Sequence, residues 1–251
     1  MNNAPLPILP SRLGATLSGN PERDRAALLD IIRGLPALQL FDGRSHHDQR
    51  DWMRQRIQGA ASVRLPELND GQRLPGREGR TTPAAVLVPI VNRPDGLTLL
   101  LTQRSANLPD HPGQISFPGG RQEADDLSPA DTALRESQEE IGLDRLRVEI
   151  LGSVGRYETV SGYSVTPVVG WVDPPIELVT DPLEVAEAFE VPLAFVFNSA
   201  NYEQHQRDVA GRTRRYFVCQ YQHRTIWGAT AAMLLLVYYA LAAPTKLSSE
   251  T

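Results

Sequence analysis

The chain has 251 residues, of which 41% are hydrophobic and 22% charged. At roughly 150 residues per domain, this length predicts one large domain, or one domain with an extension. The apolar content is high enough to bury a core, which argues against a disordered chain. Lys and Arg total 25 against 30 Asp and Glu, a net charge of -5 that argues against a broadly basic surface for nucleic acid.

Cys219 is the only cysteine, which excludes an internal disulfide framework, a cysteine-based zinc cluster and a CxxC redox pair. A single free thiol fits a reducing compartment, and we expect a cytoplasmic protein. The first residues lack a basic segment followed by an apolar one, so we expect no secretory signal peptide.

Residues 1–80 are interpreted as an N-terminal extension made of helices and loops. Residues 20–35 combine a capping Asn20 and Pro21 with apolar residues at helical spacing, which predicts a helix. A second helical stretch is expected around residues 51–57. The Gly- and Arg-rich residues 71–82 predict an exposed connection.

From Pro83 onward the pattern becomes that of a mixed domain. Two apolar, β-branched runs with turn residues between them predict a hairpin, and later runs predict further strands. The expected strands are residues 84–91, 97–102, 147–154, 164–172, 191–196 and 215–221. Strands and helices do not alternate regularly, which favours an α+β fold over a doubly wound parallel sheet.

The apolar residues 229–243 predict a helix buried in the core. Their 15 residues fall short of the roughly 20 needed to cross a bilayer, although a membrane-associated or partner-docking helix remains the alternative. Residues 246–251 form a tail.

A helix is also predicted over residues 129–141, between the capping Ser128 and the stop signal Gly142. Glu136, Glu139 and Glu140 are spaced three and four apart, so we expect their carboxylates to converge on one helix face. Such a cluster requires cations. Arg135 supplies one, and a bound Mg²⁺ or Mn²⁺ would supply the rest, because hard divalent ions prefer carboxylate oxygen. The alternative is a solvated helix with an ordinary salt bridge.

The adjoining loop favours the metal interpretation. Gly119 and Gly120 allow the backbone to turn sharply and to approach a ligand closely. A loop carbonyl can then complete a metal's coordination, and loop amides can face a phosphate. A carboxylate helix, a glycine loop and a divalent metal together indicate diphosphate hydrolysis, since the metal lowers the pKa of a bound water.

Residues 120–143 resemble the Nudix box, the loop-helix signature of hydrolases acting on nucleoside diphosphates linked to another group. The match includes Gly119-Gly120, Glu123 and the run RESQEEIGL. One position departs from the general pattern, which has a glutamate eight residues before the arginine. Leu127 stands there, and Asp126 lies one residue earlier.

Further segments resemble the coenzyme A (CoA) diphosphatase subfamily of Nudix hydrolases, over about residues 83–243. They are LLTQRS at 100–105, GQISFPGG at 113–120, SGYSVTPVVG at 161–170, segments within 184–193, and IWGATA at 226–231. The subfamily usually carries basic residues where this chain has Pro109 and Asp110. Two cations near the phosphate entrance are therefore missing, which puts affinity for CoA-like substrates in doubt.

The resemblance implies a Nudix α/β/α sandwich with a mixed sheet over residues 81–245. It also implies hydrolysis of CoA, and of CoA esters as a further option, to 4′-phosphopantetheine and adenosine 3′,5′-bisphosphate. The alternatives are a Nudix hydrolase of another nucleoside diphosphate derivative, such as ADP-ribose, and a catalytically silent binding module. The expected partner is a small molecule, without nucleic acid or membrane, and a homodimer remains open.

The resemblance implies a role for each box residue. Glu136 and Glu140 are the principal metal ligands, with the Gly120 carbonyl as a further one. Glu139 either binds a second metal or takes a proton from water. Arg135 orients Glu139, and Glu123 is a second candidate for its partner.

Four residues are expected to bind substrate: Arg104, His111, Tyr163 and Gly119. Arg104 suits bidentate phosphate binding, although a surface arginine is the alternative. His111 either donates to a phosphate or packs in its loop. Tyr163 either lines the substrate or is a buried tyrosine bonded to backbone.

Overall fold

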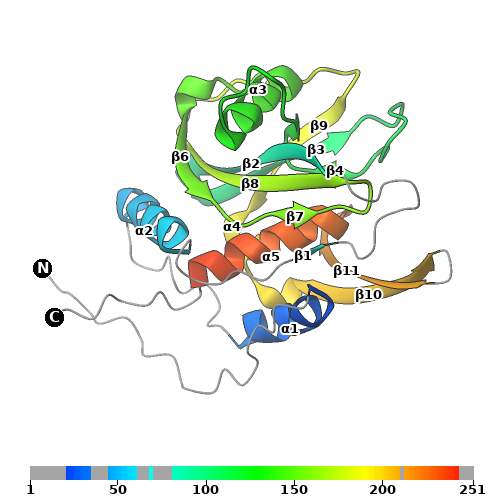
Figure 1. The fold of residues 1–251 in the computed structure, drawn as a ribbon. Helices are drawn as coiled ribbons and strands as arrows, with labels where there is room; N and C mark the ends of the chain where they lie inside the picture. The colour runs from blue at the N-terminus through cyan, green and yellow to red at the C-terminus, as the bar shows by residue number, and fades with distance from the viewer. Residues whose placement is uncertain (1–20, 35–44, 61–67, 70–80, 210–211, 243–251) are drawn as a thin grey trace, which may run out of the picture.

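The computed structural model describes residues 21–34, 45–60, 68–69, 81–209 and 212–242 (Figure 1). Residues 71–80 of the expected connection and the tail at 246–251 lie outside these residues. The molecule is layered around a mixed sheet, with helix α3 on one face and helices α2 and α5 on the other (Figure 1). The predicted α+β sandwich is therefore confirmed.

The main sheet has nine strands and mixed pairing. Central strand β2 is parallel to β8 and antiparallel to β3 and β5. The strands are β1 (Leu68–Asn69), β2 (Thr82–Arg93), β3 (Gly96–Arg104), β4 (Ile115–Ser116), β5 (Gly119–Arg121), β6 (Val148–Ser153), β7 (Tyr157–Glu158), β8 (Tyr163–Val172) and β9 (Val185–Pro192). Strands β2 and β3 pair only near their shared turn. Farther along, β5 pairs with β2 and β4 pairs with β3.

A second, antiparallel sheet packs against the far side of α5. It consists of β10 (Tyr202–Val209), β11 (Arg212–Tyr221) and β12 (Arg224–Trp227). The helices are α1 (Pro21–Arg33), α2 (His46–Ala60), α3 (Pro129–Ile141), the short α4 (Leu193–Val196) and α5 (Gly228–Ala242), with 3-10 turns η1 (Arg145–Arg147) and η2 (Ser199–Asn201).

Most predicted elements are present, and one prediction was wrong in part. The strand expected at residues 191–196 ends at Pro192, and Leu193–Val196 forms the helical turn α4. A short, fully apolar run does not distinguish a buried strand from a buried helix by its periodicity. The sequence analysis also missed β10, β12 and the short strands β1, β4, β5 and β7, so the expected glycine loop at residues 119–120 is part of a strand. Helix α2 is longer than the predicted residues 51–57.

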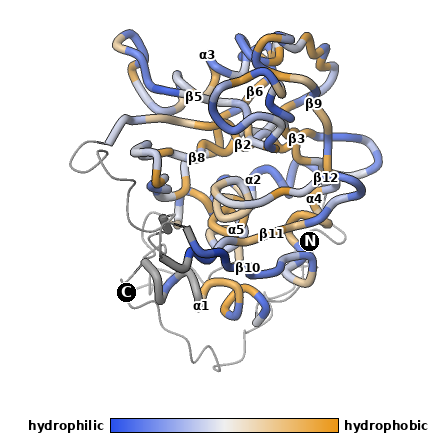
Figure 2. Tube along the Cα trace, turned by 90° about the vertical axis from the view of Figure 1, so that its right-hand side faces the viewer, coloured by the Kyte–Doolittle hydropathy of each residue, from blue (hydrophilic) through white to orange (hydrophobic). Residues whose placement is uncertain are grey.

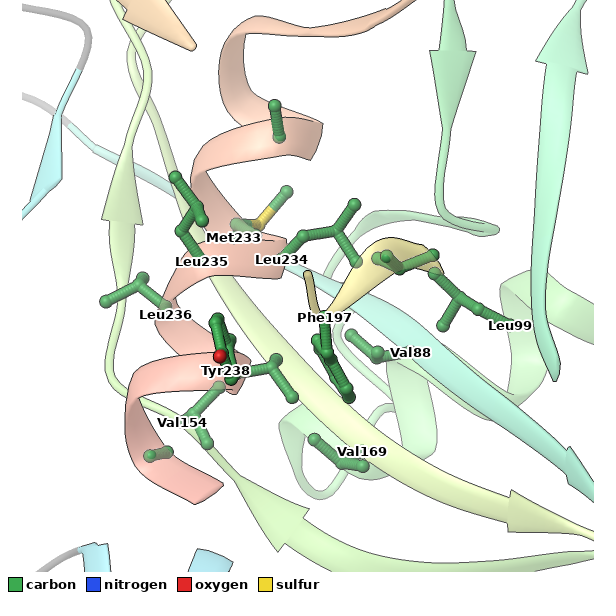
Figure 3. Close-up of a cluster of buried hydrophobic side chains, with 14 of the residues drawn as sticks. Val88, Leu99, Val154, Val169, Phe197, Met233, Leu234, Leu235, Leu236 and Tyr238 are labelled. Carbon is green, nitrogen blue, oxygen red and sulfur yellow. The ribbon is translucent and has the colours of Figure 1, made fainter. Parts of the chain in front are cut away.

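Helix α5 lies in the middle of the molecule and is buried on almost every side. Twelve of its 15 residues are buried, as the sequence predicted. Its side chains Met233, Leu234 and Tyr238 lie among Phe197 and the sheet residues Val88 and Val169 (Figure 3). In Figure 2 it is an apolar segment enclosed between the two sheets. No helix among the described residues is long and apolar enough to cross a membrane.

The N-terminal helices belong to the same core. Leu28 and Ile32 of α1, and Met53 and Ile57 of α2, are fully buried in the cluster that contains α5. Ile57 packs directly on Gly152 of β6, where a Cβ would approach its Cγ2 to 2.8 Å. Helices α1 and α2 therefore help to cover α5 and stabilise the domain.

Candidate active site

Helix α3 is positioned by its caps and by a face of small residues. The Ser128 side chain accepts a hydrogen bond from the Asp131 backbone N–H, and Gly142 ends the helix in the left-handed conformation. Ala133 and Ser137 are buried against the sheet, which lets the helix approach β2 and β5 closely. This approach brings the carboxylates of α3 beside the glycine strand β5.

Glu136 and Glu140 occupy the contact between α3 and β5. Glu140 is only 5% exposed, and the Gly119 N–H donates to its Oε2 over 3.1 Å. The Glu136 carboxylate lies so close to Gly120 that a Cβ there would be 2.6 Å from its Oε1. Any side chain at position 120 would displace this carboxylate, so glycine there leaves room for its observed position.

The electrostatics of this contact are unfavourable to two ionised carboxylates. Burial raises the pKa of Glu140 to about 8, and the charges of Glu136 and Glu184 add to the effect, while the Gly119 N–H and Arg104 oppose it. Burial likewise raises the pKa of Glu136, despite the neighbouring Arg135. An additional cation beside them would favour the ionised form of both groups.

Arg135 links the helix to the loop before it. Its Nε and Nη2 donate to the two carboxylate oxygens of Asp126, each over 3.0 Å. Its Nη1 lies 3.0 Å from Glu136 Oε1 and 2.9 Å from Glu139 Oε2. The paired bonds from Arg135 hold the pKa of Asp126 well below its usual range.

Arg135 thus makes the expected bond to Glu139, but its second carboxylate partner is Asp126 and not Glu123. Glu123 is exposed, and only its backbone N–H is engaged, donating to Asp126 Oδ2 over 2.9 Å. Asp126 also accepts from the Thr132 hydroxyl. An aspartate one residue before the usual glutamate was the sequence signal for this role.

Glu139 lies apart from the buried Glu140 but shares the Arg135 guanidinium with Glu136. Its side chain is 59% exposed and bonded to Arg135 at the rim of the site. Glu139 therefore meets Glu136 at Arg135 and not at the contact with β5 that Glu136 and Glu140 share. Across the described ranges, no group of three or more His, Cys, Asp or Glu side chains is arranged to hold a metal ion.

Glu184, which the sequence analysis did not single out as a site residue, supplies a carboxylate from another segment. It is electrostatically coupled to both Glu136 and Glu140. Two backbone bonds tie its loop to α3, from the N–H of Val179 to Ile141 and from that of Asp181 to Glu140. The N–H of Ser105 donates to the Glu184 carbonyl over 2.8 Å.

The expected substrate residues lie on both faces of the main sheet. Arg104 is on the α3 side and is electrostatically coupled to Glu140, while its Nη2 contacts the Asp110 carbonyl. Its Nε is buried without a hydrogen-bond partner among the described residues. His111 is exposed in the loop between β3 and β4, in the left-handed region at a φ of 56°.

Two further expectations are changed by the structure. The Gly119 N–H, expected to face a phosphate, donates to Glu140 instead. Tyr163 is 38% exposed at the start of β8, so it is not a buried tyrosine. By strand alternation it shares the sheet face of Val165, which packs in the α5-side core, and thus lies opposite the carboxylates.

The residues present fit a hard divalent cation. Glu140 offers buried and Glu136 partly buried carboxylate oxygens, and burial raises the pKa of both, so a cation beside them would be favourable. Mg²⁺ commonly binds through one or two carboxylates together with waters and substrate phosphates. That no three such side chains among the described residues are arranged to hold a metal ion is compatible with that mode.

Comparison with known proteins identifies the family. The NUDIX domain model matches residues 81–210, about half of the chain. The chain belongs to the Nudix family. An uncharacterized Nudix hydrolase named NudL from Photorhabdus laumondii is 43% identical over 153 residues, covering 60% of this chain and 80% of that protein. The Pectobacterium atrosepticum NudL is 42% identical, covering 60% of this chain and 78% of the relative.

Among solved structures, the Nudix hydrolase RenU from M. smegmatis matches 46% of this chain and 73% of its own, with 22% identity and a TM-score of 0.40. Membership of the Nudix family makes this protein a hydrolase of diphosphate-containing substrates, and Nudix enzymes generally use a divalent metal ion such as Mg²⁺.

Proposed function

We propose that this Nudix hydrolase cleaves the diphosphate of CoA, giving 4′-phosphopantetheine and adenosine 3′,5′-bisphosphate. The observation that carries the proposal is the position of the CoA diphosphatase-like segments. LLTQRS covers the end of β3 at Arg104 and the following Ser105, and GQISFPGG contains β4 and the first two residues of β5 beside the carboxylates. Arg104 is coupled to Glu140, and Gly119 is bonded to it, so both segments meet at one site.

Glu136 and Glu140 would hold the Mg²⁺ or Mn²⁺, with the Gly120 carbonyl as a further ligand. When bound, such an ion offsets the negative charge of the diphosphate and lowers the pKa of water. Gly120 keeps the space for the Glu136 carboxylate, and the Gly119 N–H fixes the orientation of Glu140. These contacts preorganise two ligands before substrate arrives.

Arg135 is the positioning residue of the site. Because Asp126 takes two of its nitrogens, its third is directed to Glu139 and Glu136. Glu139 is exposed at the rim, where it can take a proton from the attacking water. Glu184 faces the same carboxylates from a different segment and is a second candidate for that proton.

Arg104 and His111 bind the phosphates in this proposal. The planar guanidinium of Arg104 suits bidentate phosphate contacts, and its Nε lacks a partner among the described residues. His111 is exposed in a loop that Arg104 holds through the Asp110 carbonyl. A bound diphosphate would therefore contact both the loop between β3 and β4 and the carboxylates of α3.

The test is a product assay with the full chain and Mg²⁺ or Mn²⁺. CoA, 3′-dephospho-CoA and ADP-ribose are incubated separately and the products identified by mass, with labelled water showing which phosphorus is attacked. The proposal requires CoA to be cleaved with the higher kcat/KM. Preferred cleavage of ADP-ribose would select the alternative substrate, and no turnover of any of them would contradict the proposal.

A further inference from the structure

An exposed arginine lies directly behind the carboxylate site, on the opposite face of the main sheet. In β5, Gly120 pairs with Ala85 and faces α3, since its missing Cβ would meet Glu136. Adjacent strand residues point to opposite faces. Arg121, which pairs with Ala84, therefore faces the α5 side.

An exposed aromatic ring shares this second face. Ala84 pairs with Val165 of β8, and both belong to the α5-side core. Tyr163 lies two residues before Val165 and is paired with Thr82, so its ring is on the same face. Arg121 and Tyr163 thus stand on either side of β2, where the small residues Thr82 and Ala84 form the floor.

The backbone of Arg121 is fixed by a hydrogen bond, whereas its guanidinium is available to bind a ligand. Arg135 Nη2 donates to the Arg121 carbonyl over 3.1 Å, which ties this strand to the catalytic helix. Within the described part of the chain, no hydrogen bond or ion pair engages the guanidinium of Arg121. An exposed cation and an exposed aromatic ring on one sheet face, next along β5 to the glycine that contacts Glu136, suit a nucleoside phosphate.

We propose that Arg121 and Tyr163 form the subsite for the nucleoside half of the substrate, with Arg121 binding the ribose 3′-phosphate and Tyr163 stacking on the adenine. The proposal rests on CoA as the substrate. In this proposal the diphosphate of CoA binds with Arg104 on the α3 side. A cation on the other face would therefore bind a phosphate outside the diphosphate, and CoA has such a phosphate on its ribose.

This subsite also accounts for the departure at the phosphate entrance. The chain has Pro109 and Asp110 where the related diphosphatases usually have basic residues. A cation at Arg121 compensates for part of that missing charge from another strand. Specificity for a 3′-phosphorylated nucleotide would then depend on β5 instead of the β3–β4 loop.

The experiment measures binding of adenosine 3′,5′-bisphosphate and of AMP by calorimetry to the full chain. We expect Arg121→Gln to weaken bisphosphate binding about tenfold and to leave AMP almost unchanged, because only the 3′-phosphate contact is lost. Tyr163→Leu should weaken both ligands by a similar factor. The control is Arg145→Gln, a 51% exposed arginine of η1 that pairs with Asp131, and it should change the binding of neither ligand.

Equal weakening of both ligands by Arg121→Gln, or no weakening, would overturn the subsite. So would a wild-type protein that binds the bisphosphate no more tightly than AMP. Turnover separates this failure from failure of the proposed function: CoA hydrolysis with no effect of Arg121→Gln rejects only the subsite. Absence of CoA hydrolysis rejects the substrate, even if the bisphosphate binds.

Discussion

The two faces of the main sheet bury different kinds of side chain. The α5 side holds a large apolar cluster that includes both sheets, α5 and the N-terminal helices. The α3 side has a much smaller apolar cluster, and its helix buries Glu140 and partly buries Glu136. The α5 side stabilises the domain, whereas the α3 side retains an electrostatic cost that a bound cation can relieve.

The largest expected effect is a loss of activity when a carboxylate on the α3 side is substituted. Glu140→Gln should keep the fold and lower kcat by orders of magnitude, because a ligand of the divalent ion is lost. Glu177→Gln, an exposed carboxylate in the connection before β9, is the matched control and should retain activity. Near wild-type kcat of the Glu140 variant at saturating Mg²⁺ would contradict the metal assignment.

A cavity in the core on the α5 side should lower stability and leave kcat almost unchanged. Leu234 is fully buried in α5, and Leu234→Ala should lower the free energy of unfolding by about 2–5 kcal/mol. Chemical denaturation measures this loss. The kcat of the folded fraction should stay close to wild type, since Leu234 belongs to the cluster remote from α3.

The melting temperature of the metal-free protein should depend on pH through the α3 side. The folded-state pKa of Glu140 is about 8, above its ordinary value of 4.5, so the folded state binds the proton more tightly. This contribution to stability is complete below 4.5 and is lost as pH rises through about 8. The melting temperature should therefore fall over this range, and it should fall less in Glu140→Gln.

Adding Mg²⁺ should raise the melting temperature of the wild type more at pH 8 than at pH 5, because the ion binds the ionised carboxylate. A Mg²⁺ effect independent of pH would argue against binding at Glu136 and Glu140.

Asp126→Asn tests the positioning of Arg135. The substitution removes the charge that holds Arg135 through two bonds, so we expect kcat to fall about ten- to a hundredfold, as for other orienting partners. Asp125→Asn, at the exposed neighbouring position, is the control. Asp126→Glu should restore part of the activity, which a purely structural defect in the loop would not allow.

The smallest expected effect concerns the phosphate entrance. Pro109→Arg with Asp110→Lys should lower KM for CoA several-fold, since a solvated ion pair contributes about 0.5–1 kcal/mol. The change should weaken at high salt and leave kcat unaltered. A lower kcat would indicate that Pro109 shapes the loop, and unchanged kinetics would place these residues away from the substrate.

Local spacing was enough to predict much of this protein. Ser128, Pro129 and Gly142 determine where α3 begins and ends, and the predicted boundaries match the structure. The apolar length of residues 229–243 predicted a buried helix, and the RESQEEIGL run led to the Nudix family. These features depend on neighbours along the chain, which the sequence displays directly.

Only the tertiary structure decided which distant groups meet. The backbone placed Asp126, not Glu123, against Arg135, and brought Glu184 to the carboxylates of α3. Strand alternation put Arg104 and Tyr163 on opposite faces of one sheet, although both had been assigned to the substrate. Such contacts depend on register and on the packing of segments far apart in the chain, and a shift of one residue reverses the face that a side chain occupies.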